Sequence, residues 1–256
     1  MSGQGPERPE RVELGDRDGG RPQGVSGWLR WTARTDHPTV TFAREVLLSV
    51  LGVALVGVLL FAVSGIWPPM VAVESGSMEP HMYRGDLVFV MEEHRLAPAF
   101  ATAGTGVVTY REAAGRDTYR KFGDYGDVIV FSADGGGTTP VIHRARFWVD
   151  TGENWYDRAD PDFVGGATAC EVDEDPDTDT AMPNCPAPHA GFITKGDNVM
   201  TNRRYDQVAG ISGPVRPTWI KGTAEVRIPW LGYVRLYFSE SRALPAVALP
   251  VPDSGA

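Results

Sequence analysis

A serine, a histidine and two aspartates in this chain are of the types that together hydrolyse peptide bonds. Ser77 stands between Gly76 and Met78, and His143 follows a short apolar run. The carboxylates come later, at positions 197 and 206. A serine hydroxyl attacks a carbonyl carbon only when a nearby base takes its proton, and a carboxylate commonly orients that base. Taken singly, each residue has an ordinary structural explanation, because loop serines, strand histidines and turn aspartates are common.

The other four histidines are weaker candidates for the base. His37, His94 and His189 lie in a predicted tail or in polar segments. His81 is four residues after Ser77, but the intervening Pro80 disfavours a helix that would bring the two side chains together. His143 is therefore the candidate base.

The candidate residues occur within an ordered series of motifs. The series is Ser77-Met78-x-Pro80, Arg84-Gly85-Asp86-Leu87-Val88, Gly126-Asp127-Val128-Ile129-Val130-Phe131, Val141-Ile142-His143-Arg144 and Ile193-Thr194-Lys195-Gly196-Asp197-Asn198. It resembles the type I signal peptidases, most closely their archaeal and endoplasmic-reticulum branch. Bacterial members usually carry a lysine base where this chain has His143. The resemblance covers roughly residues 45–240 and implies an antiparallel β-sheet catalytic domain close to a membrane.

The resemblance also implies residue roles. Ser77 matches the nucleophile, His143 the general base, and Ser75 a position whose hydroxyl helps the Ser77 backbone N–H to stabilise the oxyanion. Such a mechanism needs no metal ion and no organic cofactor. An imidazole base acts in its neutral form, so activity should fall as the pH drops below roughly 6–7.

The orienting acid has two candidates. In this branch Gly-Asp-Asn is followed by a second aspartate about six residues later, but here that position is Arg203 and the next aspartate is Asp206. Either the loop is three residues longer, or Asp197 acts alone. We favour Asp197 as the acid and keep Asp206 as the second candidate.

One apolar segment predicts a membrane anchor. Val46–Trp67 lies in a stretch without charged residues between Glu45 and Glu74. Its 22 residues would form a helix of roughly 33 Å, enough to cross the bilayer core. A cleaved signal peptide would begin near residue 1, so we expect a retained anchor.

Basic residues predict the orientation of this anchor. Arg30, Arg34 and Arg44 precede the span, and Arg84 alone lies at a similar distance after it. Basic flanks stay in the cytoplasm, so we expect a single-pass protein of the cell membrane with a cytoplasmic N-terminus and an extracytoplasmic catalytic domain.

Four regions follow along the chain. Residues 1–45 form a largely disordered cytoplasmic tail, with a short helix possible over 28–45, and residues 46–67 form the transmembrane helix. Residues 70–240 form a mainly β domain, and residues 241–256 a flexible tail. The predicted strands are Met70–Val73, Asp86–Met91, Gly106–Tyr110, Asp127–Ser132, Pro140–Val149, Gly191–Thr194, Thr223–Ile228 and Gly232–Phe238.

An acidic insertion, residues 150–190, interrupts this domain. It holds eleven acidic residues and one arginine, so we expect a surface excursion with few apolar anchors. Cys170 and Cys185 bracket its most acidic part, and outside the cell they can form a disulfide. The run of aspartates from Asp173 to Asp179 lacks the glycine and glutamate of a helix–loop–helix calcium loop, so a solvated acidic face is the better interpretation.

Charge and motifs together favour one function over its alternatives. The net charge of −9 argues against a general nucleic-acid binder. The motif series predicts removal of signal peptides from secreted preproteins, with the lipid membrane and secretion machinery as partners. The alternatives are a non-catalytic binding or assembly module on the same fold, a peptidase that trims another class of secreted precursor, and a calcium-binding adhesin.

Overall fold

The computed structural model describes residues 24–25, 37–136, 139–171 and 180–240. The chain divides into two compact units, residues 1–57 and 58–256. The aspartate run 173–179 and the tails 1–23 and 241–256 lie outside the described residues, so the predictions made for them remain predictions.

Helix α2, Pro38–Ser64, is 27 residues long and is apolar enough to cross a membrane. It begins eight residues before the predicted span Val46–Trp67 and ends three residues before that span ends. Gly65 stops the helix because it adopts a left-handed φ of 81°, which side chains with a Cβ atom rarely tolerate. The guanidinium of Arg95 donates hydrogen bonds to the last free carbonyls, at 2.7 Å from Ala62 O and 3.1 Å from Val63 O.

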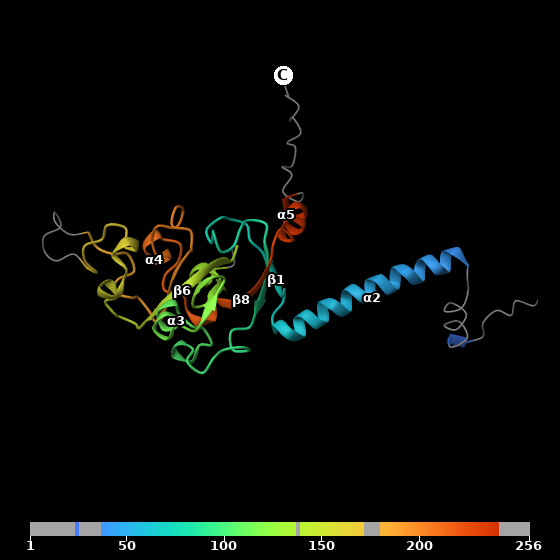
Figure 1. Ribbon diagram of the computed structural model, residues 1–256, viewed down its shortest axis with the longest axis horizontal. Coiled ribbons are helices and arrows are strands. Elements are labelled where there is room, and N and C mark those ends of the chain that lie inside the picture. Colours follow the sequence, from blue (N-terminus) through green and yellow to red (C-terminus); the bar gives the residue numbers. More distant parts are fainter. Residues whose placement is uncertain (1–23, 26–36, 137–138, 172–179, 241–256) are drawn as a thin grey trace, which may run out of the picture. The chain divides into compact units, whose positions relative to one another are not determined.

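The unit from residue 58 onward is built on one antiparallel sheet with the strand order β1-β2-β8-β5-β6-β7 (Figure 1). Its strands are β1 Met70–Ala72, β2 Leu87–Met91, β5 Val128–Phe131, β6 Val141–Val149, β7 Gly191–Lys195 and β8 Ile220–Ile228. A two-stranded ribbon, β3 Arg120–Lys121 and β4 Asp124–Tyr125, stands apart. The prediction of a mainly antiparallel β-fold with one long N-terminal apolar helix is thus confirmed for the described residues.

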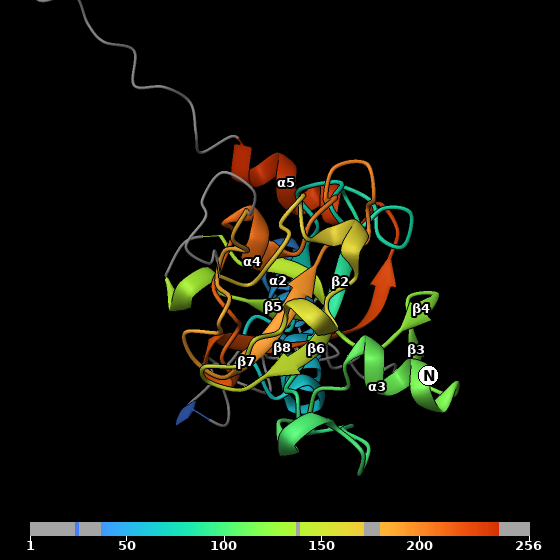
Figure 2. The ribbon, with the colours of Figure 1, turned by 90° about the vertical axis from the view of Figure 1, so that its left-hand side faces the viewer.

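Short helices cover the sheet. Helix α3 packs against β6 (Figure 2), and α5 packs against β1 (Figure 1). The α-helices are α3 Tyr110–Arg116, α4 Asp206–Ala209 and α5 Gly232–Glu240, and the 3-10 turns are η1 Thr102–Gly104, η2 Ala133–Gly135, η3 Tyr156–Arg158, η4 Pro161–Phe163 and η5 Pro217–Trp219. Buried apolar side chains form three clusters around the sheet.

The strand prediction for Gly106–Tyr110 is wrong. Val107 and Val108 are fully buried, but this segment forms no strand and leads into α3. Thr109 caps that helix by accepting a hydrogen bond from the backbone N–H of Glu112. Threonine followed three residues later by glutamate is the spacing of a capping box, so the sequence did contain this helix signal.

The strand prediction for Gly232–Phe238 is also wrong, because these residues begin helix α5. A short apolar run does not by itself distinguish a helix from a strand. Only Leu236 is buried among the large apolar side chains of Leu231–Tyr237, so one side of the helix contacts the domain.

The acidic insertion has more apolar anchors than predicted. Trp155, Val164 and Met182 are almost fully buried and pack in one cluster with Phe147 of β6 and Ile193 of β7. The described parts of the insertion are therefore part of the folded domain. The predicted disulfide between Cys170 and Cys185 is present.

Two of the acidic motif residues have structural roles. Asp86 accepts hydrogen bonds from the Tyr83 backbone N–H and from Arg227, each at 3.0 Å. Asp127 accepts from the Val108 N–H at 2.7 Å and the Tyr119 hydroxyl at 2.8 Å. Burial raises the pKa of Asp127 to about 6.

Substituting Gly126→Ala should destabilise the domain more than Gly210→Ala. Both glycines have a left-handed φ, 74° and 72°, so each alanine costs about 1–2 kcal/mol of unfolding free energy. A Cβ atom at Gly126 would in addition lie 2.5 Å from the Tyr110 backbone nitrogen, whereas nothing lies within 4 Å at Gly210. Denaturant unfolding in detergent should show roughly 2 kcal/mol or more of extra loss for Gly126→Ala. Equal losses would contradict this packing.

Candidate active site

The candidate nucleophile, Ser77, lies in a loop after β1 that buried side chains hold in place. Met78 and Met82 are fully buried, while Ser77 between the strand and these anchors is half-buried. The Ser77 Oγ lies 3.2 Å from the Ser75 Oγ, and the Ser77 backbone N–H points to the same Ser75 oxygen at 3.5 Å. The two groups expected to hold an oxyanion thus contact each other here.

The candidate base is buried on β6, an inner strand next to the edge strand β7. His143 lies on β6 opposite Ile129 of β5, and its side chain is 4% exposed. Its Nδ1 is 2.7 Å from the Asp206 Oδ2. With Nδ1 bonded to a carboxylate, Nε2 is the ring nitrogen that can accept a proton.

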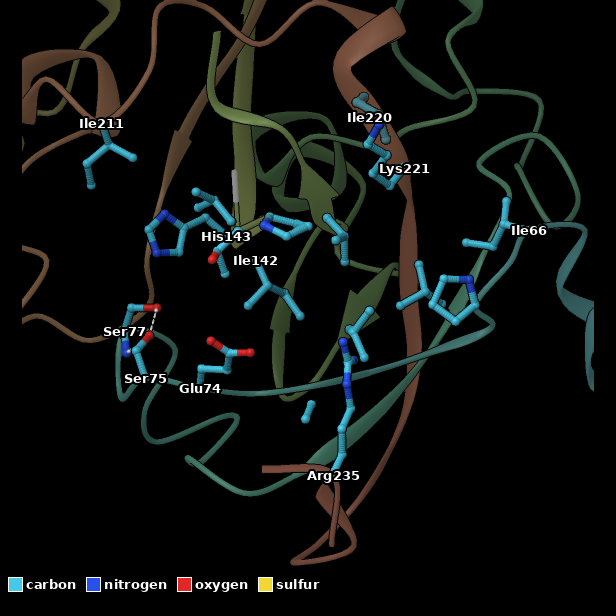
Figure 3. A pocket seen from close by; sticks show the side chains of 18 of the residues that line it. Ile66, Glu74, Ser75, Ser77, Ile142, His143, Ile211, Ile220, Lys221 and Arg235 are labelled. Atoms are coloured by element: carbon cyan, nitrogen blue, oxygen red, sulfur yellow. Dashed lines mark hydrogen bonds between the residues drawn. The ribbon is translucent and has the colours of Figure 1, made fainter. Parts of the chain in front are cut away.

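A single cavity brings the serine and the histidine together. Its volume is about 1030 Å³, and Ser75, Ser77 and His143 all line it. Ser77 and His143 lie toward one end and Ile66 toward the other (Figure 3). The walls are mostly apolar, with contributions from Val71, Ala72, Val90, Val130, Val141, Ile142, Ile211 and Ile220.

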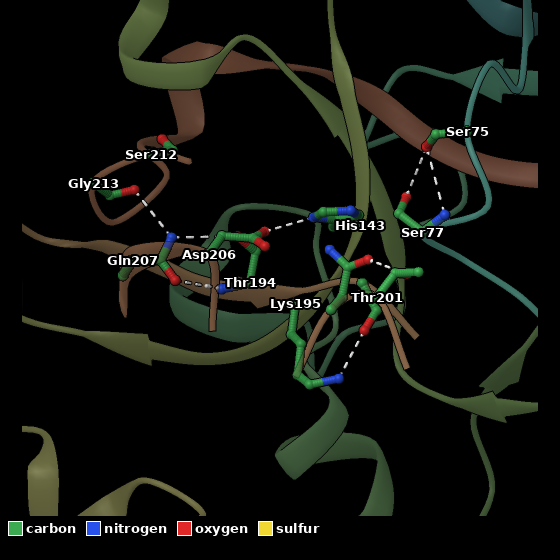
Figure 4. A network of polar contacts seen from close by, with 12 residues as sticks. Ser75, Ser77, His143, Thr194, Lys195, Thr201, Asp206, Gln207, Ser212 and Gly213 are labelled. Atoms are coloured by element: carbon green, nitrogen blue, oxygen red, sulfur yellow. Dashed lines mark hydrogen bonds and ion pairs between the residues drawn. The ribbon is translucent and has the colours of Figure 1, made fainter. Parts of the chain in front are cut away.

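Ser77 and His143 are not hydrogen-bonded to each other. Among the described residues the Ser77 hydroxyl has Ser75 as its partner, and the His143 ring has Asp206. Figure 4 shows His143 between Asp206 and the serine pair. Catalytic hydrogen bonds are often absent or long without substrate and tighten when it binds.

Asp197, the favoured candidate for the orienting acid, forms no hydrogen bond with the His143 ring in the structure. Asp197 is held instead by Arg144, at 2.9 Å from Nε to Oδ1 and 2.5 Å from Nη2 to Oδ2, and by His81 at 2.8 Å. Burial raises the pKa of Asp197, but the hydrogen bonds and charge of Arg144, assisted by His81, outweigh burial and leave it below the ordinary value. Asp206 contacts the candidate base.

The two neighbours of Asp197, Gly196 and Asn198, organise the loop that holds Ser77. The Asn198 backbone N–H donates to the Ser77 carbonyl at 2.9 Å, and its side-chain amide donates to the Gly76 carbonyl at 2.8 Å. A Cβ atom on Gly196 would lie 2.6 Å from the Ser77 carbonyl oxygen, so this close approach requires glycine. The Gly-Asp-Asn motif therefore positions the nucleophile loop.

Asp206 is held in place by residues to which the sequence analysis assigned no role. The Thr194 hydroxyl donates to the Asp206 Oδ2 at 2.7 Å, and Gln207 accepts from the Thr194 backbone N–H at 3.0 Å (Figure 4). The acidic insertion supports the same segment. The Tyr205 N–H donates to Phe163 O at 3.1 Å, and Asn184 donates to Gln207 O at 2.9 Å.

Lys195 is not positioned to act as the general base for Ser77 in place of His143. It is buried, its Nζ donates to Gly196 O at 2.8 Å, and it lies over the Phe163 ring. Burial lowers the pKa of Lys195. It does not line the cavity that holds Ser77.

One cluster among the described residues has the composition of a metal site. Ligand atoms of Glu92, Glu93 and His94 lie within 4.8 Å of one another. None of the three lines the cavity of Ser77 and His143, so this cluster does not contribute to the candidate active site.

Comparison with known proteins supports the motif resemblance. The Signal peptidase complex catalytic subunit sec11 of Aspergillus terreus is 27% identical over 221 residues, which cover 83% of this chain and 91% of that protein. The chain is similar to signal peptidase catalytic subunits. The corresponding proteins of Paracoccidioides lutzii and Paracoccidioides brasiliensis are 26% and 25% identical over 219 residues, with the same coverage. No protein-family model matches the chain. The resemblance inferred from the motif series is confirmed.

Asp197 should contribute stability that is lost in acid. Its pKa is depressed in the folded state, so this stability is present above about pH 4, the ordinary aspartate value, and is lost as the pH falls through the lower folded value. Unfolding free energies measured across this acidic range should therefore fall less steeply for Asp197→Asn than for the wild type. An unchanged slope would show that the Arg144 and His81 contacts do not perturb this carboxyl.

Proposed function

We propose that this chain is a membrane-anchored serine endopeptidase that removes N-terminal signal peptides from secreted preproteins. The main support is the His143–Asp206 contact at 2.7 Å, because it turns a buried histidine into an oriented base beside the Ser77 cavity. The similarity to catalytic subunits of signal peptidase complexes adds independent support.

In the proposed mechanism, Ser77 Oγ attacks the carbonyl carbon of the scissile peptide bond. His143 Nε2 takes the hydroxyl proton and later gives a proton to the leaving amine. Asp206 accepts from Nδ1–H, fixes the tautomer and stabilises the imidazolium. The mechanism requires the Ser77 hydroxyl to turn away from Ser75 and toward the His143 ring.

The oxyanion is stabilised by groups already close together. The Ser77 backbone N–H points to the Ser75 hydroxyl oxygen, so a tetrahedral oxygen bound beside them could accept from the N–H and from the rotating hydroxyl. Loss of one such donor typically costs about 3–4 kcal/mol of transition-state stabilisation.

Helix α2 is proposed as a single-pass anchor with the N-terminus in the cytoplasm. This places the catalytic domain outside, where the Cys170–Cys185 disulfide would persist. Enzyme and precursor then meet in one plane, which raises their effective concentration. The apolar cavity suits an extended peptide with small apolar side chains, and the relatives' names point to partner subunits of a complex.

Ser77→Ala or His143→Ala should each lower preprotein cleavage by about 10³-fold or more, because the nucleophile and its base act as one unit. The assay is cleavage of a labelled preprotein by purified full-length protein in detergent. Arg203→Ala, an exposed change in the loop before Asp206, should retain nearly full activity. A serine-directed acylating probe should label the wild type but not Ser77→Ala. Cleavage by Ser77→Ala at the wild-type rate would reject the proposal, and an unlabelled, inactive wild type would favour the binding-module alternative.

Asp206→Asn should reduce kcat by about 10²–10⁴-fold, since an amide no longer fixes the required tautomer of His143. Asp197→Asn should act mainly through stability and retain more activity when assayed well below its unfolding temperature. Side-by-side kinetics and melting curves separate the two effects. If Asp197→Asn abolishes kcat in folded protein while Asp206→Asn does not, the assignment of the acid is reversed.

A further inference from the structure

A second cavity, on α3, β6 and the insertion, gathers three arginines. Its volume is about 330 Å³. Arg111 comes from the first turn of α3, Arg146 from β6 and Arg158 from η3. The remaining lining residues are Tyr110, Ala114, Phe147, Ala159, Asp160 and Tyr205, so one carboxylate faces three guanidinium groups.

Arg146 has its hydrogen-bonding capacity free. Arg158 forms an ion pair with Glu153, and Arg111 donates to the Arg158 backbone carbonyl. The guanidinium of Arg146, by contrast, makes no hydrogen bond or ion pair with any described residue, and it lies 3.8 Å from the centre of the Tyr110 ring. Its five N–H donors therefore remain available to a ligand.

The three cations are held in place by the fold. The β6–β7 register shifts between Ala145 and Phe147, and this bulge takes Arg146 out of the regular ladder. Arg111 and Arg158 both lie over the Phe147 ring, at 4.7 and 5.3 Å from its centre. Ring stacking of this kind limits the freedom of a guanidinium before any ligand binds.

Repulsion among the three guanidinium groups favours the binding of an anion in this cavity. The pKa of Arg111 is lowered, first by burial and then by the charges of Arg158 and Arg146. Lys195 lies nearby, and after burial the charge of Arg146 is the main influence that lowers its pKa. A cationic cavity is a distinctive local feature of a chain whose net charge is −9.

We propose that the cavity lined by Arg111, Arg146 and Arg158 is a binding site for a phosphate group. The planar guanidinium fork matches phosphate oxygens with paired hydrogen bonds, and the volume admits a phosphate with a small organic substituent. The ligand is either the free ion or a phosphomonoester, such as a lipid headgroup that ends in an unsubstituted phosphate. The site is separate from the Ser77 cavity and does not depend on the proposed peptidase activity.

Calorimetric titration of the full-length protein in detergent tests this site. Inorganic phosphate, added against chloride of equal ionic strength, should bind saturably. Arg146→Gln should weaken binding at least about tenfold, because it removes the free guanidinium fork. Arg216→Gln is the matched control, since Arg216 is exposed, lies over the Trp219 ring and is outside the cavity, and it should change the affinity less than about twofold. Ser77→Ala should bind phosphate as the wild type does.

Glycerol 3-phosphate distinguishes the two sources of the ligand. Tighter binding than inorganic phosphate supports a phosphomonoester headgroup, and weaker binding supports the free ion. If Arg146→Gln does not fold, Arg111→Gln on the first turn of α3 should show the same loss. Absence of saturable binding by both phosphates, or equal weakening by Arg146→Gln and Arg216→Gln, would overturn the proposal.

Discussion

The contact between Asp206 and His143 is the interaction on which the candidate active site depends. Asp206 is completely buried, and a buried carboxylate is costly unless hydrogen bonds compensate for its lost hydration. One of its oxygens accepts from both the His143 ring and the Thr194 hydroxyl, while the other has no partner in the described structure. Such an arrangement strongly constrains the imidazole, because any other ring orientation would leave the carboxylate poorly solvated.

Two parts of the fold hold the Ser77 loop and Asp206 in position. The loops that follow the edge strands β1 and β7 are joined through the Asn198–Ser77 hydrogen bond, so the sheet must curl enough to bring its two ends together. On the other side, the acidic insertion holds Tyr205 among Phe147, Trp155 and Phe163. The insertion thus supports helix α4, whose first residue is Asp206. The buried part of the insertion therefore has a structural role.

Much of this arrangement could be predicted from sequence. Alternating and β-branched runs located six strands of the main sheet, and the motif order singled out Ser77 and His143, which line one cavity in the structure. The wrong predictions concern segments whose local sequence is compatible with more than one secondary structure or degree of burial. The segment before the Thr109 cap and the α5 segment were predicted as strands, because their short apolar runs are compatible with either a helix or a strand. The composition of the insertion suggested a solvated loop, because a few buried anchors such as Trp155 are outnumbered by acidic residues.

The choice between the two acids shows this limit most clearly. Asp197 and Asp206 are nine positions apart, and their side chains are 4% and 0% exposed. Which one faces His143 depends on the Arg144 side chain that captures Asp197 and on the Thr194 hydroxyl that orients Asp206. Neither contact has a signature in the spacing of the motif.

The tautomer of His143 is the most direct test of this account. Nitrogen-15 NMR of histidine-labelled full-length protein, in mildly alkaline buffer, reports which ring nitrogen carries the proton. The account predicts a protonated Nδ1 and a bare Nε2 in the wild type and in Asp197→Asn, with this preference lost in Asp206→Asn. A proton on Nε2 in the wild type, or a tautomer that responds to Asp197→Asn but not to Asp206→Asn, would contradict it.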